Sequence, residues 1–213
     1  FFKSISVLII TMNYIHLFYT IVMALNISGK IAPARPKPLQ ASVLPAFNAS
    51  KKDKKESAEV IPWSIDRRLE WDDFLCPPKR NSDAVASTST SLGISYKIEN
   101  GQLVYGITCD FSKTKSWGLL RTDYILAHEQ GHFDITEIAA RRLHQALQQY
   151  NFNRRNYRND INEIYRAIVK EKENLQATYD EQSDHSRKRK LQYEWEEKIA
   201  LMLEETEAYA SYP

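Results

Sequence analysis

The sequence predicts an α+β fold in which a small antiparallel sheet packs on one helix, followed by two long helices. No proline lies between Pro78 and Pro213, and the last glycine is Gly131. The segment after Gly131 therefore lacks both residues that usually interrupt helices, and long helices explain it most simply. Ahead of that segment, apolar and polar residues alternate on both sides of Asn100-Gly101, a pattern typical of a β-hairpin.

The N-terminal part of the chain differs from the rest. Residues 5–25 are largely apolar and follow Lys3, which is typical of a signal peptide or a single membrane anchor. We interpret residues 1–34 in this way and expect an exported, periplasmic or extracellular protein. The alternative is a protein attached to the membrane through an uncleaved segment, with membrane contact through residues 5–25 only. Residues 35–60, with several prolines and a lysine cluster, predict a disordered linker, so the folded domain is expected to span residues 61–213.

The positive charge of the chain is confined to its beginning. The formal net charge is +2, and beyond residue 50 acidic residues slightly outnumber basic ones. Residues 1–50 contain no acidic residue and four basic ones, Lys3, Lys30, Arg35 and Lys37. Without a sustained basic patch in the folded part, nucleic acid is not expected as a partner.

The predicted sheet rests on two alternating segments. Residues 92–98 and 103–111 each place an apolar side chain at every second position. Between them, Asn100-Gly101 is a strong signal for a tight turn, because both residues tolerate positive φ angles.

The predicted helices follow at once. Residues 123–149 form one amphipathic pattern, and residues 155–179 form a second with apolar residues at helical spacing. A polar break at 180–187 separates them from a third helix that includes Leu191 and Leu203.

The first helix carries an HExxH motif, His128-Glu129-Gln130-Gly131-His132. Histidines four apart lie about 40° apart around a helix, so both can reach one zinc ion. Apolar residues of the same helix share their face, which places the pair against the core. Glu129 lies at the edge of that face, where a general base for a zinc-activated water is needed.

A catalytic zinc usually has three protein ligands and one open position. Nearby polar residues of the same helix cannot supply the third, because they lie on other faces of it: Asp134, Glu137 and His144. The polar break holds better candidates. His185 is the first choice, with Asp180 or Asp184 as the fallback, and helical glutamates further on stay open: Glu194, Glu204 and Glu205.

The residues around this motif carry a resemblance. The run from Leu126 to Glu137, with HEQGHFDI at its centre, resembles the core of an uncharacterised bacterial family described as zinc-dependent proteases. That family belongs to the wider HExxH, or zincin-like, metallopeptidase group. The similarity extends from about Trp71 to Trp195, and HEQGHFDI is its most specific part.

The resemblance implies a zincin-like fold and a bound zinc, with His128 and His132 as ligands and Glu129 as the base. It also favours His185, which falls in a Tyr-Asp…His stretch that the family shares. It supplies no substrate.

The expected function is a zinc metalloprotease that hydrolyses peptide bonds with a metal-activated water and Glu129 as general base. The expected cofactor is Zn²⁺ and the partner is a peptide or protein substrate, held by a sheet strand from residues 92–111. The alternative is a non-catalytic zinc-binding or envelope interaction domain with a helical bundle. A further alternative is a structural protein whose histidine pair belongs only to the core.

The chain has two cysteines, Cys76 and Cys109. In an exported protein they could form one disulfide, and two free, buried cysteines are equally compatible with the sequence.

Overall fold

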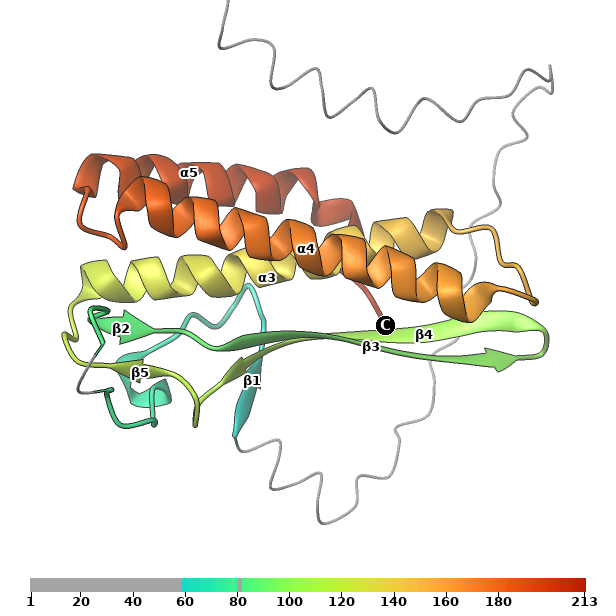
Figure 1. Cartoon of the computed structure of the whole chain (residues 1–213), viewed down its shortest axis with the longest axis horizontal. Coiled ribbons are helices and arrows are strands. Elements are labelled where there is room, and N and C mark those ends of the chain that lie inside the picture. Colours follow the sequence, from blue (N-terminus) through green and yellow to red (C-terminus); the bar gives the residue numbers. More distant parts are fainter. Residues whose placement is uncertain (1–58, 80–81) are drawn as a thin grey trace, which may run out of the picture. The chain divides into compact units, whose positions relative to one another are not determined.

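A computed structural model describes residues 59–79 and 82–213 (Figure 1). The predicted leader at 1–34 and nearly all of the predicted linker at 35–60 lie outside these residues. Within them, no helix is both long and apolar enough to cross a membrane.

The described part combines small antiparallel sheets with three long helices, which confirms the α+β class. The helices are α3 (Asp123–Gln149), α4 (Tyr157–Ser183) and α5 (Arg189–Glu205). Helix α3 packs against the β3–β4 hairpin and against α4 and α5, and α4 also contacts β3 through Tyr165, as the arrangement in Figure 1 shows. The short elements are η1 (Trp71–Asp73), β5 (Trp117–Gly118) and η2 (Glu207–Tyr209).

The main sheet has three antiparallel strands in the order β1-β4-β3, with β1 at Val60–Pro62. Strands β3 (Thr90–Glu99) and β4 (Gln102–Ser112) form the predicted hairpin. Asn100 and Gly101 have φ angles of 52° and 79°, as a tight turn that fits the twist of the two strands requires. The two-residue strand β2 (Ala86–Ser87) pairs with β5 in a separate two-stranded sheet.

Helix α3 begins where its sequence predicts, because Thr122 accepts a hydrogen bond from the backbone N–H of Ile125 and caps the helix.

Helix α4 continues to Ser183, so the prediction of a polar break starting at residue 180 was wrong. Tyr179 and Ser183, one turn apart, are both buried, and this inner face holds the helix together past the predicted end. The helix ends only where Asp184 adopts a left-handed conformation.

The face of α3 opposite the histidines also carries buried charge. Arg141 donates to Glu137 over 2.8 Å, and Tyr212 donates to the other carboxylate oxygen of Glu137 over 2.7 Å. Burial raises the pKa of Glu137, while the Arg141 and Tyr212 contacts oppose that rise. Glu137 is thus part of an internal ion pair and is not near the histidine pair, as its position on the helix predicts.

Both cysteines are free: Cys109 is buried in β4 and Cys76 is half-buried. Of the two alternatives that the sequence left open, the structure has the one without a disulfide.

Candidate metal centre

The two motif histidines meet an aspartate from the next helix. His128 Nε2 lies 3.2 Å and His132 Nε2 lies 3.1 Å from Asp180 Oδ1. Together these residues form a group whose ligand atoms all lie within 4.8 Å of one another. In a tetrahedral site with ligands about 2.0–2.1 Å from zinc, neighbouring ligand atoms are about 3.3 Å apart. The two nitrogen–oxygen distances therefore already match the spacing that one small cation needs.

The charge state of Asp180 suits a cation. Burial raises the pKa of this carboxyl group, but the hydrogen bonds with His128 and His132 outweigh it and hold the pKa well below its ordinary value. Burial lowers the pKa of His128, but the contacts with Asp180 and Gln192 outweigh this effect. The pKa of His128 therefore lies above its ordinary value. An ionised carboxylate is the form that binds metal, and a bound cation would take the place of the protons that these contacts share.

A second layer of contacts orients His128. Its Nδ1 lies 2.8 Å from Gln192 Oε1 and donates its N–H to this amide oxygen, so that Nε2 is the ring nitrogen that faces Asp180. Gln192 is fully buried, and its amide donates to the Tyr179 hydroxyl over 2.7 Å. The Tyr179 ring lies 4.6 Å from the His128 ring, and its hydroxyl donates to the His128 carbonyl. These contacts fix the orientation of the His128 ring, as the partners of metal-bound histidines do for those rings.

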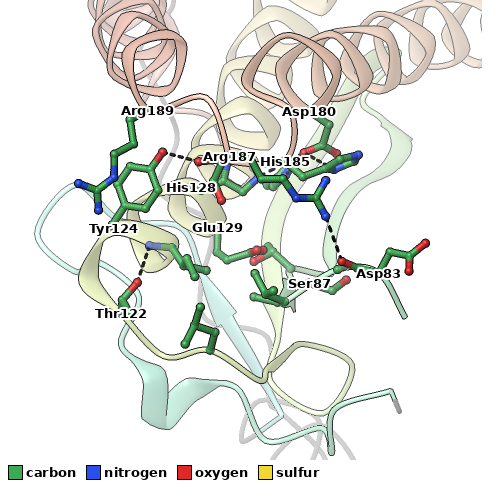
Figure 2. A pocket seen from close by; sticks show the side chains of 18 of the residues that line it. Asp83, Ser87, Thr122, Tyr124, His128, Glu129, Asp180, His185, Arg187 and Arg189 are labelled. Carbon is green, nitrogen blue, oxygen red and sulfur yellow. Dashed lines mark hydrogen bonds and ion pairs between the residues drawn. The ribbon is translucent and has the colours of Figure 1, made fainter. Parts of the chain in front are cut away.

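Glu129, unlike the buried Glu137, has a carboxylate oxygen without a hydrogen-bond partner among the described residues. The residue is only 4% exposed, yet among the described residues its buried Oε2 atom has no hydrogen-bond partner. Burial of an unpartnered polar atom is unfavourable, so such an atom in a native fold calls for an explanation. Glu129 reaches into the same pocket as His128 and Asp180 (Figure 2), where a reacting group could pair with it.

His185 and Asp184, the other residues predicted for the third ligand, lie outside the group of three. His185 Nδ1 is 3.5 Å from Asp180 Oδ1, and 59% of the side chain is exposed. The Asp184 carboxylate pairs with Arg187 on the surface. Asp180 was predicted only as the fallback for the third ligand, behind His185. It is nevertheless the residue that the structure brings to both histidines.

The loop that carries His185 has an unusual backbone. Asp184, His185 and Ser186 have φ angles of 52°, 50° and 68°, so three consecutive residues other than glycine are left-handed. Each such residue is disfavoured by roughly 1–2 kcal/mol. Hydrogen bonds hold the loop in place: the His185 N–H donates to the Asp180 carbonyl over 2.9 Å, and the Tyr124 hydroxyl donates to the Ser186 carbonyl.

The three donors and Glu129 open into a cavity of about 660 Å³, which we call the metal pocket. Its walls come from α3, from the loop after α4, and from residues 83–88, which include β2 (Figure 2). Among the described residues the β3–β4 hairpin does not line it, although residues 92–111 were predicted to hold a substrate there. The strand beside this pocket is β2, too short to be predicted from alternation.

Gly131, inside the motif, packs against Tyr179 so closely that a Cβ atom would lie 2.6 Å from the Tyr179 hydroxyl oxygen. We therefore expect Gly131→Ala to lower the free energy of unfolding by about 1–3 kcal/mol, because the buried ring cannot move aside and overpacking outweighs the better helix propensity. Urea denaturation measures the change.

Tyr179→Phe is the matched second variant, since it removes the oxygen atom nearest to the added methyl group. The double variant should lose less stability than the sum of the two single variants. Strict additivity, or a Gly131→Ala protein as stable as the original, would show that the contact does not explain this glycine.

Residues 77–186 match the family described as "Bacterial protein of unknown function (DUF922)". The match includes all of α3 and α4 and therefore His128, Glu129, His132, Asp180 and His185. Gln192 lies beyond it. No match was found among curated proteins or among solved structures.

Proposed function

We propose that this chain, which belongs to the DUF922 family of bacterial proteins of unknown function, is a zinc-dependent peptidase of the HExxH, zincin-like group. One observation carries the proposal. The nitrogen atoms of two imidazole rings lie 3.1 and 3.2 Å from one carboxylate oxygen, and Glu129, whose buried Oε2 atom has no hydrogen-bond partner among the described residues, lines the same pocket.

The donor set fits zinc. Two histidines and one carboxylate are a known ligand set of catalytic zinc sites, which keep a fourth position open for water or substrate. His128 and His132 come from the HExxH helix, and Asp180 would be the third ligand. The spacing of Glu129 within the motif is the one that zinc peptidases use for their general base.

When bound, zinc would act as a Lewis acid that acidifies water and polarises a peptide carbonyl. Glu129 would accept the proton of the attacking water through its unpartnered oxygen and later return it to the leaving amine. Gln192 would keep His128 oriented during this step. In the described part of the chain β2 pairs only with β5, so an extended peptide would pair with its other edge.

The first test of this proposal is metal content together with hydrolysis. We expect one zinc per chain in the purified protein by elemental analysis, and cleavage of members of a mixed peptide library detected by mass spectrometry. A chelator should abolish cleavage and added zinc should restore it. The absence of stoichiometric zinc would reject both a zinc peptidase and any other zinc-binding function.

A non-catalytic zinc-binding domain is the second candidate, favoured by the position of His185. Its Nδ1, 3.5 Å from Asp180 Oδ1, could approach as a fourth ligand and close the site. X-ray absorption of the zinc protein separates the two functions. Three histidine neighbours would indicate a closed site, whereas two histidines with a water oxygen would indicate an open one.

A further inference from the structure

A second cavity, of about 580 Å³, adjoins the metal pocket. We call it the lysine pocket. Three residues line both cavities: Ser87, Thr88 and Gln176. Because the same residues line both, the two cavities are adjacent at β2, and Figure 2 shows Ser87 at the edge of the metal pocket.

Residues with an ammonium or hydroxyl group form most of the lining of the lysine pocket, and none of the described residues that line it is acidic. Its charged residues are Lys79, Lys115 and Lys172, and its hydroxyl groups belong to Ser87, Thr88, Ser89, Thr90 and Thr114. Within residues 59–79 and 82–213, none of the three lysines has a carboxylate within 4.0 Å. The neighbouring Lys113 and Arg142 differ, since each pairs with an acidic side chain. Three unpaired ammonium groups around one cavity attract an anion.

A residue that lines both cavities carries a hydroxyl group without a hydrogen-bond partner among the described residues. The hydroxyl oxygen of Thr88 is buried and makes no hydrogen bond in the structure. Thr88 follows β2 directly and lines both cavities. A ligand that spans them would pass this hydroxyl and could satisfy it.

We infer that the metal pocket and the lysine pocket form one groove for an acidic peptide, in which Lys115 and Lys172 bind a carboxylate side chain to one side of the scissile bond. This inference rests on the proposed peptidase function and specifies its substrate class. Lys172 is half-buried on α4 and Lys115 is exposed in the loop before β5, so they approach the cavity from two sides. Lys79 adds charge from a third segment.

The backbone from residue 83 to residue 90 runs along both cavities. Its length sets the distance, along a bound peptide, between the scissile bond and the acidic side chain. Residues 83–88 line the metal pocket, and residues 87–90 line the lysine pocket. An extended peptide advances about 3.3 Å per residue, as this segment of the chain itself does. The preferred acidic residue should therefore lie about two to four residues from the bond that is cut.

The test measures binding without cleavage. A zinc-loaded Glu129→Gln protein is titrated into two fluorescein-labelled peptides that differ only in having glutamate or glutamine, and anisotropy gives the dissociation constants. We expect the glutamate peptide to bind about fivefold to tenfold more tightly, with a difference that shrinks as salt is added. Adding Lys115→Gln and Lys172→Gln should remove the difference.

Lys170→Gln is the matched control, because Lys170 is an exposed lysine of the same helix that does not line the cavity. It should leave the preference unchanged. Equal affinity for the two peptides, or a preference that survives the loss of both lysines, would overturn the inference. Circular dichroism of each variant shows whether the fold is intact, and the single lysine variants give the same comparison if the double variant unfolds.

Cleavage by the unsubstituted protein separates this inference from the function on which it rests. If the protein cuts the glutamate and glutamine peptides equally well, the peptidase function stands and the acidic groove is rejected. If the Glu129→Gln protein selects the glutamate peptide through its lysines but the unsubstituted protein never cuts it, the groove stands and the peptidase function is rejected.

Discussion

Glu129→Gln is expected to lower the rate of peptide hydrolysis by about 10²- to 10⁴-fold while the zinc content stays at one per chain. Glutamine has nearly the same shape as glutamate but cannot accept the proton of the attacking water. Because Glu129 Oε2 makes no hydrogen bond in the structure, the amide breaks no existing contact of that atom. The loss should therefore appear in kcat, with little change in the folded state. Initial rates on a cleaved library peptide and elemental analysis measure the two quantities.

Glu181→Gln makes the same chemical change on an exposed side chain next to Asp180 in sequence. It should keep full activity, so a loss confined to Glu129→Gln assigns the effect to the position. Full hydrolysis by the Glu129→Gln protein would eliminate Glu129 as the base. Loss of zinc in that variant would show instead that the carboxylate holds the metal.

The second large effect concerns the third ligand. We expect Asp180→Asn to weaken zinc binding by more than about a hundredfold, the upper range for partners that only orient a ligand. The substitution removes the negative charge that both histidines contact at 3.1–3.2 Å. Competition with a chromophoric chelator measures the affinity, and thermal unfolding of the metal-free protein shows whether the fold survives.

His185→Ala is the matched comparison, and we expect it to change zinc affinity no more than a few-fold. Its side chain is largely exposed and its ring nitrogen contacts only Asp180 among the three candidate ligands. Weak binding by both variants would support the closed, non-catalytic site. Tight binding by Asp180→Asn with weak binding by His185→Ala would restore His185 as the third ligand.

Much of the fold could be predicted because its signals are local. The bounds of α3 follow from a regular apolar pattern, and the hairpin follows from alternation around Asn100-Gly101. The geometry of His128 and His132 needs only the helix to exist, since four residues make about one turn.

The residues missed or misranked depend on contacts between distant segments. Asp180 was assigned to a loop because its neighbours are polar, but burial of Tyr179 and Ser183 continues the helix and turns Asp180 toward the histidines. Gln192 lies far along the chain from His128, and no periodic pattern marks a glutamine as the partner of an imidazole. The resemblance included Gln192 without indicating its role.

The left-handed run at residues 184–186 limits how this sequence can vary. Glycine at any of the three positions would relieve backbone strain, so substitutions that make the loop more stable are available. The same glycine would also free the backbone that holds His185 beside Asp180. A variant with such a glycine would then be more stable, but the loop at residues 184–186 beside the metal pocket would be less ordered. Selection for thermal stability alone should favour such changes, and selection for the function of the pocket should oppose them.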